Sequence, residues 1–226
     1  MDRMTRFKEI ASMLEDRLEW LDFCVMRDHT SFNNTAWDPE VEAFLEDDNA
    51  EMVSGCTKGC IIDWANDYVY KIGFLDAVED KDAGYTDYCE RECDLYHQMS
   101  ADSEIPKEIF DIFVPVYFLG NYTITAHGRE CSIPVYGQEV AEIDEERVYT
   151  TSVSNYCKSG NHEVYTDNDL EEQWENFEET EQVELCFPTL MYDVLNAYNI
   201  NDIHASNVGY INGKLRIFDY AGYGIM

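Results

Sequence analysis

The amino-acid sequence predicts an α+β protein in two lobes: N-terminal helices lead into an antiparallel-sheet lobe with one key helix, followed by a truncated, mostly helical lobe. Apolar residues have helical spacing near the N-terminus, strand-like runs begin at Met52, and a helical pattern precedes a short C-terminal hairpin. A chain of 226 residues, 45% of them hydrophobic, can divide its core between two small lobes. We expect a helical appendage over 1–50, the sheet lobe over 51–142, and an acidic connection with the minimal helical lobe over 143–226.

The N-terminal region is predicted to form two amphipathic helices. A second, shorter helix begins at Asp38-Pro39, because Asp38 is a good N-cap and proline is favoured at the first helical position. The apolar residues expected to face inward are Met4, Phe7, Ile10, Met13, Leu14, Leu18 and Leu21 in a helix over 4–27, and Val41, Phe44 and Leu45 in the second helix.

The sheet lobe is predicted from short runs of β-branched and aromatic residues bounded by turn residues. Several strands with one inserted helix are typical of a small antiparallel lobe. The expected order is a strand at 60–62, a turn at 65–67, a strand at 68–74, a helix over 84–99, and strands at 114–125 and 132–140.

The C-terminal lobe is predicted to contain a helix over 169–198, interrupted at Pro188, and a hairpin whose strands flank Asn212-Gly213. An Asn-Gly pair between apolar runs is a strong signal for a two-residue hairpin turn. This turn is expected to bring Asn207 and Asp219 to the same end of two paired strands.

The net charge of −32 is unevenly distributed. Residues 139–184 contain 15 acidic residues and only two basic ones, Arg147 and Lys158, whereas residues 201–226 have no net charge. Direct nucleic-acid binding is disfavoured because phosphates repel such a surface, and basic proteins are the natural partners. The alternative is that the charge only keeps the chain soluble.

The eight cysteines are expected to be reduced thiols, because their neighbours are core-like and a chain of this length needs no disulfides. Two CxxxC pairs, Cys56 with Cys60 and Cys89 with Cys93, leave a zinc site as the less favoured alternative. No run of about 18 apolar residues occurs, so we expect a soluble, cytoplasmic protein that does not enter a membrane.

The candidate catalytic residues in the C-terminal region are Asp202, Asn207 and Asp219. An Asp, an Asn five residues later and an Asp after a following strand have the spacing of a base and two magnesium ligands in phosphoryl-transfer enzymes. Asp202 would accept the proton of the attacking hydroxyl group. Asn207 and Asp219 supply the oxygen ligands that a hard cation prefers.

The candidate phosphate-binding residues lie in the sheet lobe. Lys71 is a lone cation in an apolar strand, and a helix-borne carboxylate would orient it; Glu90 is preferred, with Glu92 as the competing choice. Gly55 and Gly59 are expected in a loop whose backbone cradles phosphates, although a plain β-turn is the alternative. A surface lysine on an edge strand is the alternative for Lys71.

These residues resemble the protein-kinase-like fold, and more narrowly the early serine/threonine protein kinases of lytic bacteriophages. The stretches that carry the resemblance are 68–74, 83–89 and 202–207, within a region from 50 to 222. The resemblance implies ATP and Mg²⁺ as cofactors. It also implies these roles: Lys71 contacts the phosphates, Glu90 pairs with Lys71, Asp202 is the base, Asn207 and Asp219 hold magnesium, and Gln138-Glu139-Val140 forms the hinge, where Glu139 and Val140 contact ATP.

The resemblance further implies phosphoryl transfer to Ser or Thr of host proteins, and to the kinase itself, in a host-takeover or anti-defence role in the host cytoplasm. The acidic segment favours basic, nucleic-acid-associated clients.

Three departures from the family pattern affect this interpretation. Ile200-Asn201-Asp202 replaces His-Arg-Asp, Tyr220-Ala221-Gly222 replaces Phe-Gly, and the seven residues after Asp219 contain no activation segment or Ala-Pro-Glu motif. Substrate choice is therefore expected to come from elsewhere. One alternative is a catalytically weak pseudokinase that acts as an acidic, DNA-mimic-like inhibitor of a basic host protein. Another is a small-molecule phosphotransferase, which usually has a larger helical lobe.

Overall fold

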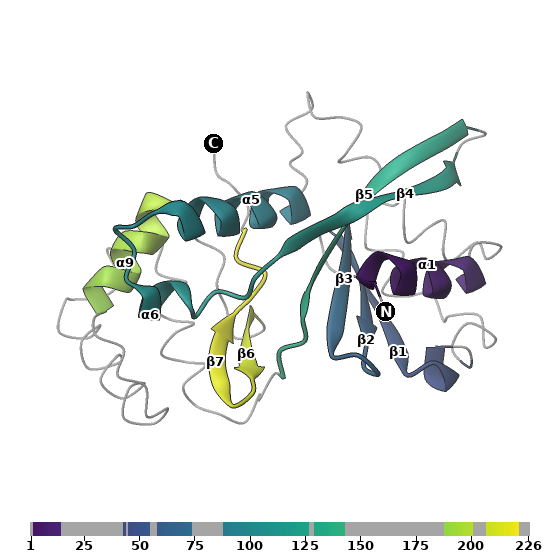
Figure 1. Cartoon of the computed structure of the whole chain (residues 1–226), viewed down its shortest axis with the longest axis horizontal. Coiled ribbons are helices and arrows are strands. Elements are labelled where there is room, and N and C mark those ends of the chain that lie inside the picture. The colour runs from purple at the N-terminus through teal and green to yellow at the C-terminus, as the bar shows by residue number, and fades with distance from the viewer. Residues whose placement is uncertain are drawn as a thin grey trace. The chain divides into compact units, whose positions relative to one another are not determined.

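A computed structural model describes residues 2–14, 43, 45–54, 58–73, 88–126, 129–142, 188–200 and 207–221 (Figure 1). The chain is α+β and divides into two compact units: unit 1 comprises Met1–Cys93 and Pro115–Val140, and unit 2 comprises Asp94–Val114 and Ala141–Met226. This division differs from the expected 1–50, 51–142 and 143–226. The N-terminal helix belongs to the unit that contains the sheet, and residues 94–114 join the C-terminal part.

Unit 1 is built on a five-stranded antiparallel sheet with the strand order β1-β2-β3-β5-β4. The β2–β3 hairpin turns at residues 64–67, which include the predicted turn at 65–67. Strand β4 has an irregularity between Phe118 and Gly120. The strands are β1 (Ala50–Ser54), β2 (Lys58–Asp63), β3 (Tyr68–Gly73), β4 (Tyr117–Ala126) and β5 (Arg129–Glu139).

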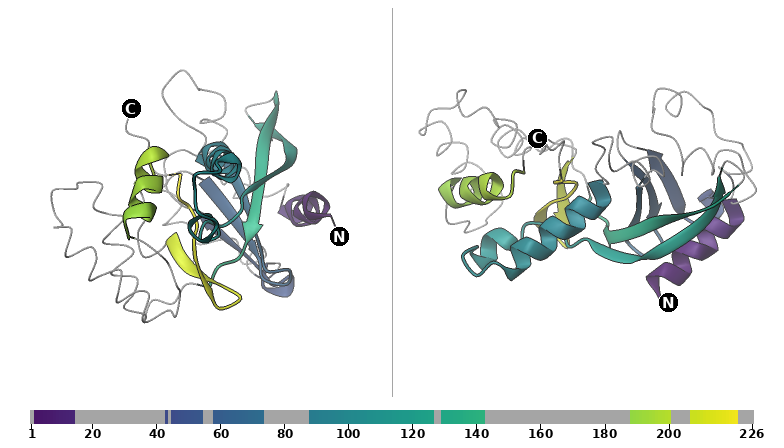
Figure 2. Two further views of the ribbon diagram at one scale, coloured as in Figure 1. Left: turned by 60° about the vertical axis from the view of Figure 1, so that its left-hand side comes forward. Right: turned by 90° about the horizontal axis from the view of Figure 1, so that it is seen from above.

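Helix α1 (Arg3–Leu14) covers one face of this sheet (Figure 2). Its apolar residues are spaced to form one stripe, and that stripe packs on side chains that alternate along the strands. The ring of Phe7 meets those of Tyr70 and Tyr122 at centroid distances of 5.5 and 5.3 Å. The buried core comprises Phe7, Ile10, Ala11, Leu14, Leu45, Ala50, Met52, Ile61, Tyr68, Tyr70, Ile72, Tyr122, Ile124, Cys131, Ile133 and Val135.

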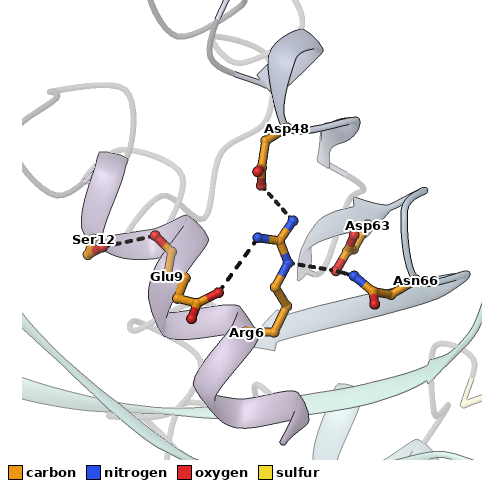
Figure 3. Close-up of polar contacts among 6 residues, drawn as sticks. All are labelled: Arg6, Glu9, Ser12, Asp48, Asp63 and Asn66. Carbon is orange, nitrogen blue, oxygen red and sulfur yellow. Dashed lines mark hydrogen bonds and ion pairs between the residues drawn. The ribbon is translucent and has the colours of Figure 1, made fainter. Parts of the chain in front are cut away.

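Arg6 attaches α1 to the β2–β3 hairpin through charged contacts (Figure 3). Its guanidinium lies 2.6 Å from Asp48 and 3.1 Å from Asp63, and Asp63 also accepts a hydrogen bond of 2.8 Å from Asn66. Burial lowers the pKa of Arg6, but the hydrogen bonds and charges of Asp63 and Asp48 outweigh that effect and raise it. The helix is therefore held by ion pairs as well as by apolar packing.

The opposite face of the sheet carries Lys71, so we name it the Lys71 face. Strand pairing places Cys60 of β2 and Tyr136 of β5 directly opposite Lys71 of β3. Helix α5 (Tyr88–Ala101) supplies Cys89 and Cys93 to a small cluster with Val116 and Tyr136. The first part of this helix therefore packs on the Lys71 face.

Unit 2 contains α6 (Lys107–Phe110), α9 (Pro188–Ala197) and the hairpin of β6 (Val208–Ile211) and β7 (Lys214–Ile217). Asn212 and Gly213 have φ angles of 53° and 71°, as a type I′ turn requires, so the predicted hairpin is confirmed. The buried core of unit 2 comprises Leu95, Met99, Ile109, Ile112, Phe113, Val194, Leu195, Ile200, Tyr210, Ile217 and Tyr220.

Several predicted segments lie outside the described residues, namely 15–27, most of the second N-terminal helix, 84–87 and 169–187. Cys60, Cys89, Cys93 and Cys131 are not in disulfide bonds, and no group of three or more His, Cys, Asp or Glu side chains suited to a metal ion occurs among the described residues. No helix within the described ranges is long and apolar enough to span a membrane.

Candidate functional site

A buried ion pair joins Lys71 to Glu92 inside unit 1. Lys71 Nζ donates a hydrogen bond of 2.5 Å to Glu92 Oε2, and the two side chains are 2% and 0% exposed. Strand β3 presents the lysine and α5 presents the carboxylate. The attraction between the two charges offsets the free-energy cost of removing them from water, and it does so only while both partners are present.

The preference for Glu90 as the partner of Lys71 was wrong, because the structure pairs Lys71 with Glu92. Residues two apart in a helix point in directions roughly 200° apart, so only one of the two glutamates can face the sheet. Glu92 is next to Cys93 and three residues from Cys89, and both cysteines are buried against the sheet. The spacing of these two apolar residues is the sequence signal that identifies the inward face.

A second lysine shares the Lys71 face. Lys58 of β2 is 5% exposed and lies two residues from Cys60, which is directly opposite Lys71. Burial lowers the pKa of Lys71; the charge of Glu92 opposes this shift and the charge of Lys58 adds to it. Burial also raises the pKa of the Cys60 thiol. Lys58 was not among the predicted site residues, although alternation along the strand places it on this face.

The predicted glycine loop is described only in part. Gly59 lies within β2, where it is paired with Ser54 of β1 and Ile72 of β3, and not in the loop. Gly55 lies outside the described residues. Backbone cradling of phosphates by this segment stays a prediction.

The predicted hinge residues lie at the end of β5. Gln138 is paired with Val69, Glu139 with Tyr68, and the Val140 amide donates a hydrogen bond of 3.1 Å to the Asp67 carbonyl. The Gln138 side chain is 3% exposed, and its Oε1 has no hydrogen-bond partner within the described part of the chain.

Asn207 and Asp219 meet in unit 2, at the open end of the β6–β7 hairpin. Asn207 Nδ2 donates a hydrogen bond of 3.2 Å to the Asp219 carbonyl, and the Phe218 amide donates one of 2.9 Å to the Asn207 carbonyl. The prediction that these two residues share one end of the hairpin is confirmed. Asp219 has a φ of 59°, a left-handed conformation that is uncommon outside glycine and that concentrates at functional sites.

Two residues outside the predicted site, Tyr220 and Gly209, hold this end of the hairpin. Tyr220 is fully buried, donates a hydrogen bond of 3.0 Å to the Val114 carbonyl, and packs edge-on against Phe113. A Cβ on Gly209 would lie 2.7 Å from the carbonyl oxygen of Glu142, so glycine permits the close approach of that segment to β6. The chain that follows each candidate metal ligand is thereby held in place.

The structure thus forms two pairs of candidate residues: Lys71 with Glu92 in unit 1, and Asn207 with Asp219 in unit 2. Asp202, the candidate base, lies outside the described residues. Comparison with protein-family models, curated proteins and solved structures finds no match to this chain.

Proposed function

We propose that this protein is an ATP- and Mg²⁺-dependent phosphotransferase of the protein-kinase type that modifies Ser or Thr of basic proteins. The observation that carries the proposal is the buried ion pair between Lys71 on the third strand and Glu92 on the helix that follows. In protein kinases a strand lysine orients the α and β phosphates while a helix glutamate fixes the lysine. A buried lysine held in one position by a buried carboxylate matches that requirement.

The proposed metal ligands also suit the chemistry. Asn207 offers an amide oxygen and Asp219 a carboxylate, and Mg²⁺ prefers one or two such oxygen ligands together with phosphate oxygens. The hydrogen bond from Asn207 Nδ2 to the Asp219 carbonyl orients the amide, so that its other atom is the ligand oxygen. A bound magnesium ion would neutralise the charge of the phosphates during transfer.

In the proposed reaction the substrate hydroxyl oxygen bonds to the γ-phosphorus and the bond to the β,γ-bridging oxygen breaks, which releases ADP. Asp202 accepts the hydroxyl proton. Lys71 holds the α and β phosphates in position, and Glu92 keeps Lys71 in place. The transition state is loose, so these residues act mainly by positioning and by electrostatic stabilisation.

Basic proteins are the proposed substrates because the chain carries a net charge of −32, concentrated in residues 139–184. Exposed charges attract a partner at low ionic strength and are screened within about 3 Å in 1 M salt. Phosphorylation of basic substrates should therefore decline with salt, whereas phosphorylation of a neutral peptide should decline less.

Intact-mass spectrometry after incubation with ATP and Mg²⁺ tests the proposal, with a basic protein such as histone as the acceptor. The wild type should add phosphate in steps of about 80 Da, a mass set by the composition of the phosphoryl group. Glu92→Gln and Asp202→Ala should lower the rate at least about 100-fold, because Glu92 holds the lysine that positions the phosphates and Asp202 accepts the hydroxyl proton. Glu90→Gln is the matched control on the same helix and should stay near the wild-type rate.

The charge of the chain favours a second candidate function, an acidic pseudokinase that occupies the basic surface of a partner. If neither the wild type nor any variant transfers phosphate although the basic partner is bound, the kinase proposal fails and this second function takes its place. Equal loss of activity in Glu90→Gln and Glu92→Gln would contradict the specific role given to Glu92.

A further inference from the structure

Strand β4 forms one edge of the sheet in unit 1, and within the described part of the chain it pairs only with β5 (Figure 1). Its register with β5 is regular over residues 120–126, where Tyr122 and Ile124 are buried in the core of unit 1. The alternate side chains are exposed, namely Asn121, Thr123 and Thr125. An edge strand presents a row of backbone N–H and C=O groups with which a further strand can pair.

The β4 edge carries no charge. It lies within residues 112–128, the longest stretch of the chain without Asp, Glu, Lys or Arg. Edge strands usually avoid pairing with another chain through charged side chains, proline, bulges or short length. The other edge strand, β1, shows two of these features, because it has only five residues and carries the exposed Glu51. Residues 120–126 show none of them, since the irregularity of β4 precedes this segment.

This segment is complementary to a second copy of itself. In an antiparallel pair centred on Thr123, that residue lies opposite its own copy, and Asn121 lies opposite Thr125 on the same face of the sheet. On the other face Tyr122 lies opposite Ile124. Polar side chains then meet polar ones and apolar side chains meet apolar ones. Threonine pairs and pairs of an aromatic with a β-branched residue are among those that stabilise antiparallel sheets.

The charge of the chain favours a second copy over a basic protein as the partner of this edge. Two copies with a net charge of −32 each repel one another, and exposed charges interact over about 10 Å at 0.1 M ionic strength. Contact between copies is therefore least costly along a neutral strand, whereas a basic protein would find no acidic counterpart on β4. At the beginning of β4, Tyr117 and Phe118 are 48% and 52% exposed and offer apolar surface that a second chain can cover.

We propose that two copies of this chain pair antiparallel through β4, about a two-fold axis at Thr123, so that two five-stranded sheets become one sheet of ten strands. Such an interface is isologous, because the same segment of each copy supplies both sides of the contact. Main-chain hydrogen bonds between the two strands hold the copies together. The pairing does not depend on catalysis, so it can hold or fail independently of the proposed function.

Sedimentation equilibrium of the full-length protein measures the dissociation constant of the dimer. A charge at Thr123 would meet the same charge on the second copy, because this residue lies opposite itself. Thr123→Glu and Thr123→Lys should therefore each weaken the dimer at least about tenfold, and an equimolar mixture of the two variants should restore it. Ala65→Glu is the matched control and should dimerise like the wild type, since Ala65 is exposed in the β2–β3 turn, which β3 and β5 separate from β4.

The wild type should reach twice the mass of the chain at micromolar concentrations. Raising the salt from about 0.1 M to about 1 M should strengthen the dimer, because the repulsion between the copies is screened. A wild type that stays monomeric, or a dimer that weakens with salt, would overturn the inference. A dimer that Thr123→Glu leaves unchanged would overturn it too, as would a mixture of the two charged variants that stays monomeric.

Hydrogen exchange in the wild type gives a second readout that needs no variant. The backbone amides of residues 120–126 should exchange more slowly above the dissociation constant than below it, because pairing protects them. Equal exchange at both concentrations would show that this strand is not the interface and would overturn the inference.

Discussion

Lys71 Nζ on β3 and Glu92 Oε2 on α5 lie 2.5 Å apart, and both side chains are buried. The pair joins a strand to a helix that is separated from it in the sequence. Burial lowers the pKa of Lys71, so the charged lysine is costly in this position and depends on the carboxylate. Because its desolvation cost is high, a buried ion pair of this kind is weak evidence of a gain in stability. It is stronger evidence of a function that needs a lysine held in one position.

Removing one partner of this pair should destabilise the protein more than removing both. Glu92→Gln leaves a buried lysine without its counter-charge and should cost about 3 kcal/mol in the free energy of unfolding. The double variant Lys71→Met with Glu92→Leu replaces the pair with apolar groups and should cost clearly less. Urea denaturation measures both. Equal losses in the single and double variants would contradict the coupling of the two residues.

Replacing Arg6 should loosen the attachment of α1 to the sheet. Arg6→Met leaves the buried Asp63 without its cation and should cost about 3 kcal/mol in stability. Lys8→Met is the matched control, since Lys8 is exposed on the same helix, and it should change stability by about 0.5 kcal/mol or less. Thermal unfolding checks the difference. If the two variants melt alike, the ion pairs of Arg6 do not hold the helix.

Tyr70 should make the stability fall in alkaline solution. Burial raises the pKa of Tyr70 to about 12, and the charge of Asp63 adds to this shift. The folded state therefore holds the phenolic proton more tightly than the unfolded chain, whose tyrosine has the ordinary pKa near 10. The stability contribution is complete below pH 10 and is lost as the pH rises from 10 to about 12.

Tyr70→Phe should abolish the decrease in the free energy of unfolding that Tyr70 causes between pH 10 and 12, which amounts to about 2 kcal/mol. Near pH 7 the variant should be about as stable as the wild type, because the Tyr70 hydroxyl has no hydrogen-bond partner within the described residues. Urea midpoints between pH 9 and 12 give the comparison. Parallel pH profiles for the two proteins would show that Tyr70 titrates in the same range whether folded or unfolded.

Two glycines of the β6–β7 hairpin should respond differently to alanine. A Cβ on Gly209 would lie 2.7 Å from the Glu142 carbonyl oxygen, so Gly209→Ala forces the backbone apart and should cost about 3 kcal/mol. Gly213 has open space around it but a φ of 71°, so Gly213→Ala should cost only about 1 kcal/mol. Chemical denaturation distinguishes them. A larger loss at Gly213 would contradict the close approach at Gly209.

Local sequence rules predicted the elements that carry the candidate residues. The Asn212-Gly213 turn, the turn at 65–67, the strand around Lys71 and the pairing of Asn207 with Asp219 all depend on residues close together in the chain. Turn chemistry and apolar periodicity act over a few residues, and they can therefore be recognised without knowledge of the rest of the fold.

Contacts between distant segments were decided only by the tertiary structure. Amphipathic spacing shows that α1 has a buried face, but only the sheet beneath it determines that this helix shares the core of unit 1. The choice of Glu92 over Glu90 depends on which side of α5 meets the sheet, and the role of Tyr220 depends on a carbonyl more than one hundred residues away. Sequence by itself determined which chemical groups the chain can offer and on which elements. The packing of one element on another determined which of those groups meet, because burial and partner choice are properties of surfaces that come together only in the folded chain.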